Sequence, residues 1–171
     1  MIILLMGVSG SGKTTIGKSL AQRLSCDFED ADDFHSEENK GKMQAGIPLT
    51  DADRLPWLSD LSELLKKRSE NGQATILACS ALKSSYREKF SEAAHDLMVV
   101  YLKVDFETVA ARLEARHHEF MNPELLKSQF DTLEEPSDAI VVDANRTVEE
   151  VVDDISDHVN NSTVAKKSKA K

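Results

Sequence analysis

Short apolar runs alternate with longer segments of helical periodicity along this chain. The apolar runs predict five strands, at Ile2–Met6, Phe28–Asp30, Ala74–Cys79, Leu97–Lys103 and Ala139–Asp143. Apolar residues recur at helical spacing in four longer segments, Thr14–Leu24, Ala81–Ala94, Glu107–Arg116 and Val148–Val159. Strands that alternate with helices in this way are typical of an α/β fold around a mainly parallel sheet.

The segment between the second and third strands, residues 32–72, is too long for a single crossover helix. Its pattern predicts two helices, one around Glu37–Ala45 and one around Asp53–Glu70. Asn71-Gly72 is a stop signal for the second helix, because these residues tolerate the left-handed conformation that ends many helices. We therefore expect a helical insertion after the second strand.

A second insertion and the end of the chain interrupt the pattern later. Residues 117–136 lie between the fourth predicted strand-and-helix unit and the last strand. After Asn160 the sequence becomes rich in Ser, Ala and Lys, a composition that buries too little apolar surface to fold. We expect a single domain over residues 1–160 and a disordered basic tail over residues 161–171.

Composition and charge exclude several classes of protein. A formal net charge of −9 argues against a nucleic-acid partner, because affinity for a polyanion rests on clustered Lys and Arg. Apolar runs are too short to span a membrane, and Ile2–Met6 is too short for the core of a signal peptide. Cys26 and Cys79 lack metal-binding spacing, which favours free thiols and a cytoplasmic location.

A phosphate-binding motif follows the first strand and opens the first helix. Residues 7–14 read G-V-S-G-S-G-K-T and match G-x-x-x-x-G-K-[ST] in full. Glycines allow the backbone N–H groups to wrap around phosphate oxygens, and the helix N-terminus adds partial positive charge. The motif predicts binding of ATP with Mg²⁺ by Gly7, Ser9, Gly10, Ser11, Gly12, Lys13, Thr14 and Thr15.

Within this motif each side chain has an expected task. Lys13 would reach the β- and γ-phosphates, Thr14 would bind Mg²⁺, and Thr15 would donate to the α-phosphate. The motif alone does not separate a kinase from an ATPase or a switch GTPase. The chain has no N-K-x-D motif, so nothing in it predicts guanine recognition.

Two carboxylates at the end of the second strand favour a kinase. Asp30 and Asp32 are two residues apart and can project into the same cleft. Asp30 would hold Mg²⁺ through water, while Asp32 would meet a substrate hydroxyl and accept its proton. The alternative is that Asp32, or its neighbour Asp33, caps the next helix, which is a common role for Asp.

Longer runs resemble the gluconate kinase family of P-loop carbohydrate kinases, which is related in fold to shikimate kinase. The phosphate motif and D-A-D-D-F-H at Asp30–His35 both match that family. So do N-K-G-K-M-Q-A-G-I-P-L-T-D-A-D-R-L-P-W-L at Asn39–Leu58 and A-C-S-A-L-K-S-S-Y-R at Ala78–Arg87. H-E-F-M at His118–Met121 and L-L-K-S-Q-F-D-T-L-E-E-P at Leu125–Pro136 complete the match. His117 stands where the family usually has Gly, and the tail lies outside the match.

The resemblance implies a three-layer α/β domain with a five-stranded parallel sheet in the order 2-3-1-4-5. It implies transfer of a phosphoryl group from ATP to the 6-hydroxyl of D-gluconate, with residues 32–72 building the substrate pocket and 117–136 the lid. Family members are often homodimers, so a dimer is possible here. A kinase for another small sugar acid is the nearest alternative, and a nucleotide-dependent switch without phosphoryl transfer is a more distant one.

Gluconate carries one carboxylate and a row of hydroxyls, so its pocket needs a cation and polar partners. The candidate substrate-binding residues are Asp32, His35, Arg54, Lys83 and Arg87. Arg54 offers the planar fork of donors that suits a carboxylate, and Lys83 and Arg87 are spaced to share one helical face. His35 could instead cap a helix or pack.

Arginines near the lid are candidates for stabilising the transferred group. Arg112 and Arg116 are spaced for one helical face, and we expect Lys13, Asp32 and Arg116 to form the catalytic set. Arg112 could equally belong to an exposed, salt-bridged helix face. Gln129 either contacts the nucleotide or supports the lid. Asn145, with Thr147, either lies beside adenine or caps the last helix.

Overall fold

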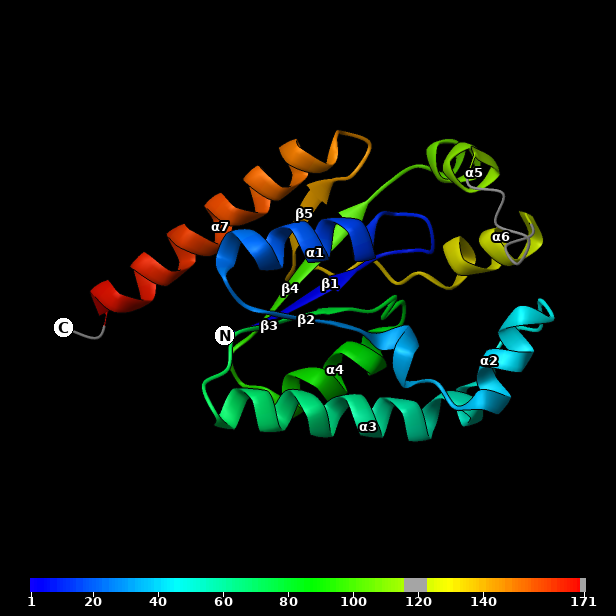
Figure 1. Cartoon of the computed structure of the whole chain (residues 1–171), viewed down its shortest axis with the longest axis horizontal. Helices are drawn as coiled ribbons and strands as arrows, with labels where there is room; N and C mark the ends of the chain where they lie inside the picture. The colour runs from blue at the N-terminus through cyan, green and yellow to red at the C-terminus, as the bar shows by residue number, and fades with distance from the viewer. Residues whose placement is uncertain (116–122, 170–171) are drawn as a thin grey trace.

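A computed structural model describes residues 1–115 and 123–169, in which a parallel sheet is covered by helices on both faces (Figure 1). Its strands are β1 (Ile2–Met6), β2 (Asp27–Asp30), β3 (Thr75–Ala78), β4 (Leu97–Lys103) and β5 (Ile140–Asp143). They are ordered β2-β3-β1-β4-β5, and every pairing is parallel. The five predicted strands and their order are confirmed.

Both predicted insertions contain helices, as do the connections between strands. They are α1 (Lys13–Leu24), the 3₁₀ helix η1 (Ala31–Phe34), α2 (Glu37–Gln44), α3 (Asp51–Glu70), α4 (Ser84–Ala93), α5 (Phe106–Ala115), α6 (Pro123–Thr132) and α7 (Val148–Lys169). The first insertion contains α2 and α3, as its pattern predicts. A reciprocal capping box between Thr50 and Asp53 makes α3 begin two residues earlier than we expected.

The first strand is buried on both faces, which explains its uninterrupted apolar sequence. Ile3 and Leu5 pack into a core beneath α1 and α7, whereas Ile2, Leu4 and Met6 pack into a second core with α3 and α4. Figure 1 shows these two helix pairs on opposite sides of the sheet. The parallel strands all end at the edge where α2, α5 and α6 lie.

Helix α7 is longer than its pattern predicts. Val151, Ile155 and Val159 are buried against the sheet, as expected. The following residues contain neither Gly nor Pro, and Ala and Lys favour helix, so the helix continues to Lys169. The structure therefore differs from the disordered tail expected over residues 161–171, of which 170 and 171 lie outside the described part.

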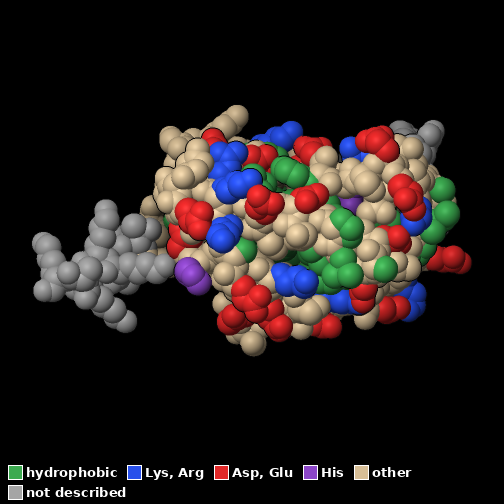
Figure 2. Space-filling view, turned by 90° about the horizontal axis from the view of Figure 1, so that it is seen from below, with side chains coloured by type: hydrophobic (Ala, Val, Ile, Leu, Met, Phe, Trp, Pro, Cys, Tyr) green, Lys and Arg blue, Asp and Glu red, His purple; other side chains and the backbone are tan. Residues whose placement is uncertain are grey.

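The outer surface of the α3 layer carries both signs of charge. Figure 2 shows acidic and basic side chains interspersed over this face, with apolar side chains between them. Such a mixed face lacks the clustered positive charge on which polyanion binding depends. Among the described residues, no helix is both long and apolar enough to cross a bilayer.

Gly17 of α1 packs against Phe28 of β2, in a space that leaves no room for a Cβ atom. A Cβ atom on Gly17 would stand 2.5 Å from Cε2 of Phe28 and 3.4 Å from Cδ2 of Leu5. Since Cβ atoms do not approach other atoms so closely, only glycine permits this spacing without a shift of the helix or the ring.

We predict that Gly17→Ala lowers the free energy of unfolding by on the order of 1 kcal/mol, because overpacking outweighs the gain in helix propensity. Gly41 in α2 provides a matched control, since a Cβ added there would have nothing within 4 Å of it. Gly41→Ala should stabilise the protein by about 0.5–1 kcal/mol. Urea unfolding of both variants measures this, and a Gly17→Ala variant as stable as the wild type would contradict it.

The 3₁₀ helix η1, which contains Asp32, is held against α3 by Trp57. The indole Nε1 of Trp57 donates to the carbonyl oxygen of Ala31 over 2.7 Å. The ring of His35 stacks on the indole, with centroids 4.4 Å apart and planes 10° apart. His35 is 7% exposed, and its Nδ1 has no hydrogen-bond partner in the described part of the chain. Burial, with smaller contributions from Arg54 and Lys40, lowers its pKa to about 4.

This buried histidine should make the protein less stable in acid. As pH falls below 6.5, the unfolded chain binds a proton at His35 that the folded protein takes up only near pH 4. The free energy of unfolding should therefore drop by about 2 kcal/mol between pH 8 and pH 5 through this residue. His35→Phe keeps a ring on Trp57 and removes the titration, so its denaturation midpoint should fall less over this range. An equal decrease of the denaturation midpoint in the wild type and in His35→Phe would contradict the prediction.

Candidate active site

The phosphate motif forms a loop between β1 and α1 whose conformation requires glycine. Gly10 and Gly12 have φ angles of 80° and 97°, and a Cβ on Gly10 would stand 2.8 Å from Val109 Cγ1. Gly12 is the N-cap of α1 and has no side chain to occupy the first N–H groups of the helix. These groups are available to an anion, as the motif predicts. Ser11 is buried beneath Gly7, and Thr15 is exposed on the first turn.

Lys13 lies across the loop. Its Nζ donates to the carbonyl oxygens of Gly7 and Val8, each over 3.0 Å. Burial lowers the pKa of Lys13, while the nearby Asp32 carboxylate opposes that shift. The ammonium group is therefore fixed inside the loop, where the phosphates of a nucleotide would meet it.

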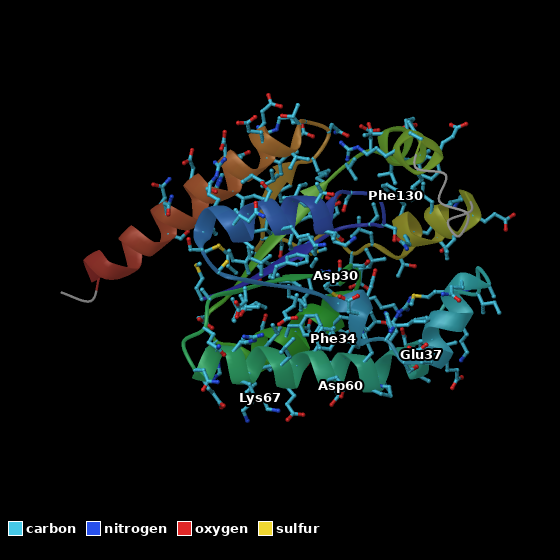
Figure 3. The ribbon with its side chains drawn as sticks, viewed as in Figure 1. Asp30, Phe34, Glu37, Asp60, Lys67 and Phe130 are labelled. Atoms are coloured by element: carbon cyan, nitrogen blue, oxygen red, sulfur yellow. The ribbon has the colours of Figure 1, made fainter. Side chains whose placement is uncertain are left out.

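The two predicted metal ligands are in direct contact. The Thr14 hydroxyl donates to Oδ2 of Asp30 over 2.7 Å, although the residues come from α1 and β2. Figure 3 places Asp30 between the helix layers, toward the end of the molecule that carries α2 and α6. A hydroxyl and a carboxylate are the oxygen donors that Mg²⁺ prefers, and the ion usually keeps several waters. By its donor chemistry this pair fits a divalent ion. The described residues contain no group of three or more His, Cys, Asp or Glu side chains that could hold a metal ion.

Asp32 does not cap a helix. Ser36 is the N-cap of α2, and the side chain of Asp30 accepts from the backbone N–H of Asp32 at the start of η1. The Asp32 side chain is accessible to solvent. The protein around its carboxyl group nevertheless raises the pKa of Asp32, because partial removal from water disfavours the charged form, and the attraction of Lys13 opposes this shift. A raised pKa is a property of carboxylates that accept protons in catalysis.

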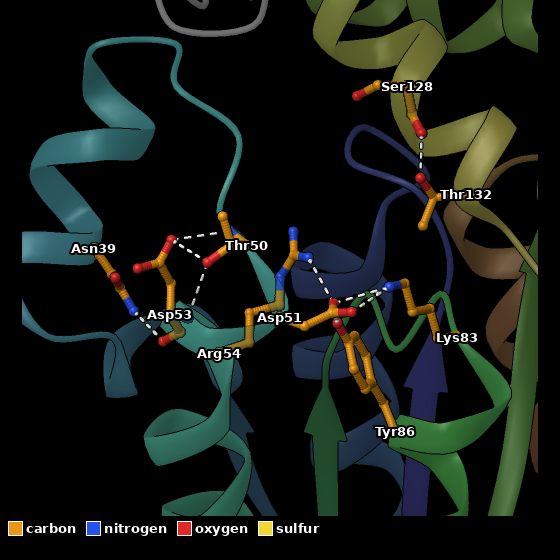
Figure 4. A network of polar contacts seen from close by, with 9 residues as sticks. All are labelled: Asn39, Thr50, Asp51, Asp53, Arg54, Lys83, Tyr86, Ser128 and Thr132. Carbon is orange, nitrogen blue, oxygen red and sulfur yellow. Dashed lines mark hydrogen bonds and ion pairs between the residues drawn. The ribbon is translucent and has the colours of Figure 1, made fainter.

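Two of the predicted substrate-binding cations meet at one carboxylate that we did not predict. Lys83 Nζ lies 2.8 Å from both oxygens of Asp51, and Arg54 Nη1 lies 4.0 Å from Oδ1. The Tyr86 hydroxyl also donates to Asp51, as Figure 4 shows. Lys83 is the largest cause of the lowered pKa of Asp51. Two cations and one carboxylate leave this cluster with one net positive charge.

Asp51 and Tyr86 were missed because their sequence positions have simpler explanations. Asp51 is the first residue of α3, where an acidic side chain is favoured by the helix dipole. Tyr86 lies in α4 among residues with helical spacing and packs in the core beneath that helix. Both belong to the runs that resemble gluconate kinases, and this was the only signal that could have marked them.

The expectation that Lys83 and Arg87 share a helical face is wrong. Helix α4 begins at Ser84, so Lys83 lies outside it in an extended conformation. Arg87 is 8% exposed, and its guanidinium donates to the carbonyl oxygens of Ala81, Leu82 and Glu134. Its contact with a substrate remains a prediction.

Arg112 also has a backbone partner. Its Nη2 donates to the carbonyl oxygen of Ala144 over 2.8 Å, which ties α5 to the loop after β5. Thr147 forms a capping pair with Glu150 at the start of α7, while Asn145 bonds to Asp143 and, at 3.4 Å, to the backbone N–H of Asp105. Of the two residues considered as caps, Thr147 caps α7, and Asn145 links the loops after β4 and β5.

Gln129 connects α6 to the phosphate loop. Its Oε1 accepts from the backbone N–H of Ser9 over 2.7 Å, and its Nε2 donates to the Ser9 hydroxyl over 3.0 Å. Helix α6 of the second insertion therefore contacts the phosphate loop directly, in agreement with the expectation that Gln129 supports the lid or contacts the nucleotide. Arg116, the third residue of the predicted catalytic set, lies outside the described residues, as do His117 and His118–Met121 of the lid region.

Known proteins are similar to this chain over most of its length. A family model for shikimate kinase matches residues 9–160. A probable gluconokinase of Dictyostelium discoideum is 42% identical, over 93% of this chain and 86% of that protein. A gluconokinase of Arabidopsis thaliana is 47% identical, over 78% of this chain and 77% of its own length. The crystal structure of a gluconokinase from Sinorhizobium meliloti 1021 superposes with a TM-score of 0.81 at 40% identity, covering 89% of this chain and 87% of that one.

A shikimate kinase structure from Aquifex aeolicus is more distant, with 20% identity and a TM-score of 0.55, and it supports the fold alone. Identity of 40–47% over most of the chain separates the closer relatives from the shikimate kinase. The chain therefore belongs to the gluconokinases, within the wider family that the shikimate kinase model describes.

Proposed function

We propose that this protein transfers the γ-phosphoryl group of ATP to the 6-hydroxyl of D-gluconate, giving ADP and 6-phospho-D-gluconate. The observation that carries the proposal is the position of three groups at one edge of the sheet. The phosphate loop follows β1. Asp30 ends β2, and Asp32 lies just after it. Lys83 follows β3. An acid with a primary alcohol can thus meet a cation, a proton acceptor and a nucleotide together.

The phosphate loop and Lys13 hold the nucleotide. The N–H groups of Ser9 and Ser11 donate to Gln129 and Val8, so other N–H groups of the loop would face the phosphates. Lys13 would exchange its carbonyl partners for β- and γ-oxygens. Thr14 and Asp30 would hold Mg²⁺, and the ion would neutralise part of the phosphate charge. Gln129 of α6 holds Ser9 of the phosphate loop.

The net positive charge of the Lys83 cluster suits a substrate with one carboxylate. Arg54 and Lys83 would exchange part of their pairing with Asp51 for the gluconate carboxylate. Asp51 and Tyr86 remain to accept and donate hydrogen bonds with the hydroxyls of the polyol chain. A neutral sugar would leave the cations without their second carboxylate partner, which is costly in a partly buried site.

A panel of substrates with Mg-ATP tests the proposal. Gluconate should give the highest kcat/KM, another aldonic acid a lower value, and glucose, which lacks the carboxylate, at least about a hundredfold less. Equal turnover of glucose and gluconate would show that the carboxylate is not recognised. A preference for shikimate would assign the pocket to the other branch of the wider family, and tight ATP binding without turnover would favour a switch.

The role of Asp32 gives a separate prediction. If Asp32 accepts the proton of the 6-hydroxyl, Asp32→Asn should lower kcat by about 10²- to 10⁴-fold, with little change in melting temperature. Its pKa is raised by burial, and only the ionised form accepts a proton. The wild-type rate should therefore fall with decreasing pH at a higher pH than an ordinary Asp would give, and the variant should lack this dependence.

Saturating ATP and gluconate and a rate-limiting chemical step are needed for this comparison. Asp33→Asn is the matched control, because Asp33 lies in the same 3₁₀ helix and contributes least to the raised pKa of Asp32. Asp33→Asn should retain kcat within about threefold. Asp32→Asn activity within a few-fold of the wild type would remove Asp32 from the catalytic set.

A further inference from the structure

The turn between β3 and α4, which carries Lys83, contains a strained residue. Ala81 has a φ of 42°, in the left-handed region that residues with a Cβ rarely adopt, and it is 2% exposed. Such a conformation persists only where the surrounding structure holds it in place, and it is common at functional sites. The contacts that hold this turn are therefore candidates for a functional role.

Arg87 holds the turn from inside the protein. Its Nη1 donates to the carbonyl oxygens of Ala81, at 2.8 Å, and Leu82, at 3.1 Å. Its Nη2 donates to the carbonyl oxygen of Glu134, at 2.9 Å. One buried guanidinium thus joins the strained turn to the segment that follows α6.

Glu134 holds the same turn from the other side. Its backbone N–H donates to the carbonyl oxygen of Leu82 over 2.9 Å. Its Oε2 accepts from the backbone N–H of Ser84 at 2.7 Å and from the Ser84 hydroxyl at 2.6 Å. Ser84 is the first residue of α4, so a carboxylate from a distant segment satisfies the N-terminus of this helix.

This arrangement leaves the Lys83 side chain for the cleft. Lys83 is the N-cap residue of α4, and its ammonium group, which has no acceptor, cannot bond to the N–H groups of the helix. Its backbone is extended, and its Nζ reaches Asp51 at the N-terminus of α3. The clamp formed by Arg87 and Glu134 fixes the backbone on both sides of Lys83, at Leu82 and at Ser84.

We propose that Glu134 and Arg87 are positioning residues that aim Lys83 at the substrate carboxylate, an inference that rests on the proposed function. Glu134 comes two residues after α6, and Gln129 within α6 is bonded to Ser9 of the phosphate loop. The same segment therefore contacts both halves of the site. Arg87 acts on the substrate through the turn, which differs from the direct contact that its sequence position suggested.

Glu134→Ala tests the proposal with a readout that a purely structural role would not move. The KM for gluconate should rise about tenfold, while the KM for ATP should change less than about twofold, because the phosphate loop keeps its own contacts. Glu134→Gln retains one acceptor for Ser84, so its gluconate KM should return to within about threefold of the wild type. Glu135→Ala is the matched control, since Glu135 pairs with Lys103 and Tyr101 instead, and its KM values should be unchanged.

A double-mutant cycle with Lys83→Ala decides whether Glu134 acts through Lys83. In the Lys83→Ala background, Glu134→Ala should raise the gluconate KM less than about twofold further. If the rise in gluconate KM in the double variant equals the product of the rises in the two single variants, the proposal is overturned. A lower melting temperature of Glu134→Ala with an unchanged gluconate KM would also overturn it. Either result leaves the proposed function intact. If Lys83→Ala itself leaves gluconate KM unchanged, the carboxylate subsite is wrong and this inference fails with it. Should Glu134→Ala not fold, Glu134→Asp replaces it, because the shorter side chain withdraws the carboxylate from Ser84. A gluconate KM of Glu134→Asp equal to that of the wild type would overturn the proposal.

Discussion

Parallel pairing of β1 with β3 on one side and with β4 on the other determines where the functional residues meet. The carboxyl ends of parallel strands share one edge of a sheet, and ligands of open α/β sheets bind there. Each functional segment lies at the carboxyl end of a different strand, so the segments converge although they are far apart in sequence. They are the phosphate loop, Asp30 and the Lys83 turn. This pairing in turn depends on burial of β1 on both faces, since neither core forms without the helices of its own layer.

The Lys13 and Asp32 pair illustrates how the cleft prepares charge before a substrate arrives. Burial lowers the pKa of Lys13 and raises that of Asp32, so it disfavours both charges, while their mutual attraction opposes each shift. The carbonyls of Gly7 and Val8 hold the ammonium group in place. Groups fixed in this way need little reorganisation when charge moves during phosphoryl transfer.

Four basic residues that looked alike in the sequence have two different kinds of partner. Lys83 and Arg54 lie beside the carboxylate of Asp51, whereas Arg87 and Arg112 donate to backbone carbonyls. A carboxylate partner can be exchanged for the carboxylate of a substrate in an accessible cleft. The carbonyls that Arg87 binds belong to the strained turn at Ala81, so Arg87 cannot leave them without disrupting that turn. The first pair therefore suits binding, and the second suits support of the site.

The sequence by itself determined the sheet, the phosphate loop and the family, because these depend on local signals. Apolar runs and a glycine-rich motif are each readable within a few residues. The sequence also marked Thr14 and Asp30 as candidate metal ligands, and Arg54 and Lys83 as candidate substrate-binding residues. It did not determine the roles of Asp51, Glu134 and Arg87, or the end of α7.

Only the tertiary structure decided those roles, since each depends on a partner that is distant along the chain. In the sequence alone, Asp51 looks like an ordinary acidic residue in the first turn of a helix. In the folded protein, Lys83 and Tyr86 lie against its carboxylate. Glu134 reads as a loop residue until folding places its carboxylate at the N-terminus of α4. The physical reason is that hydrogen bonds and ion pairs act over a few ångströms, whereas the chain brings their partners together only through packing of the whole sheet.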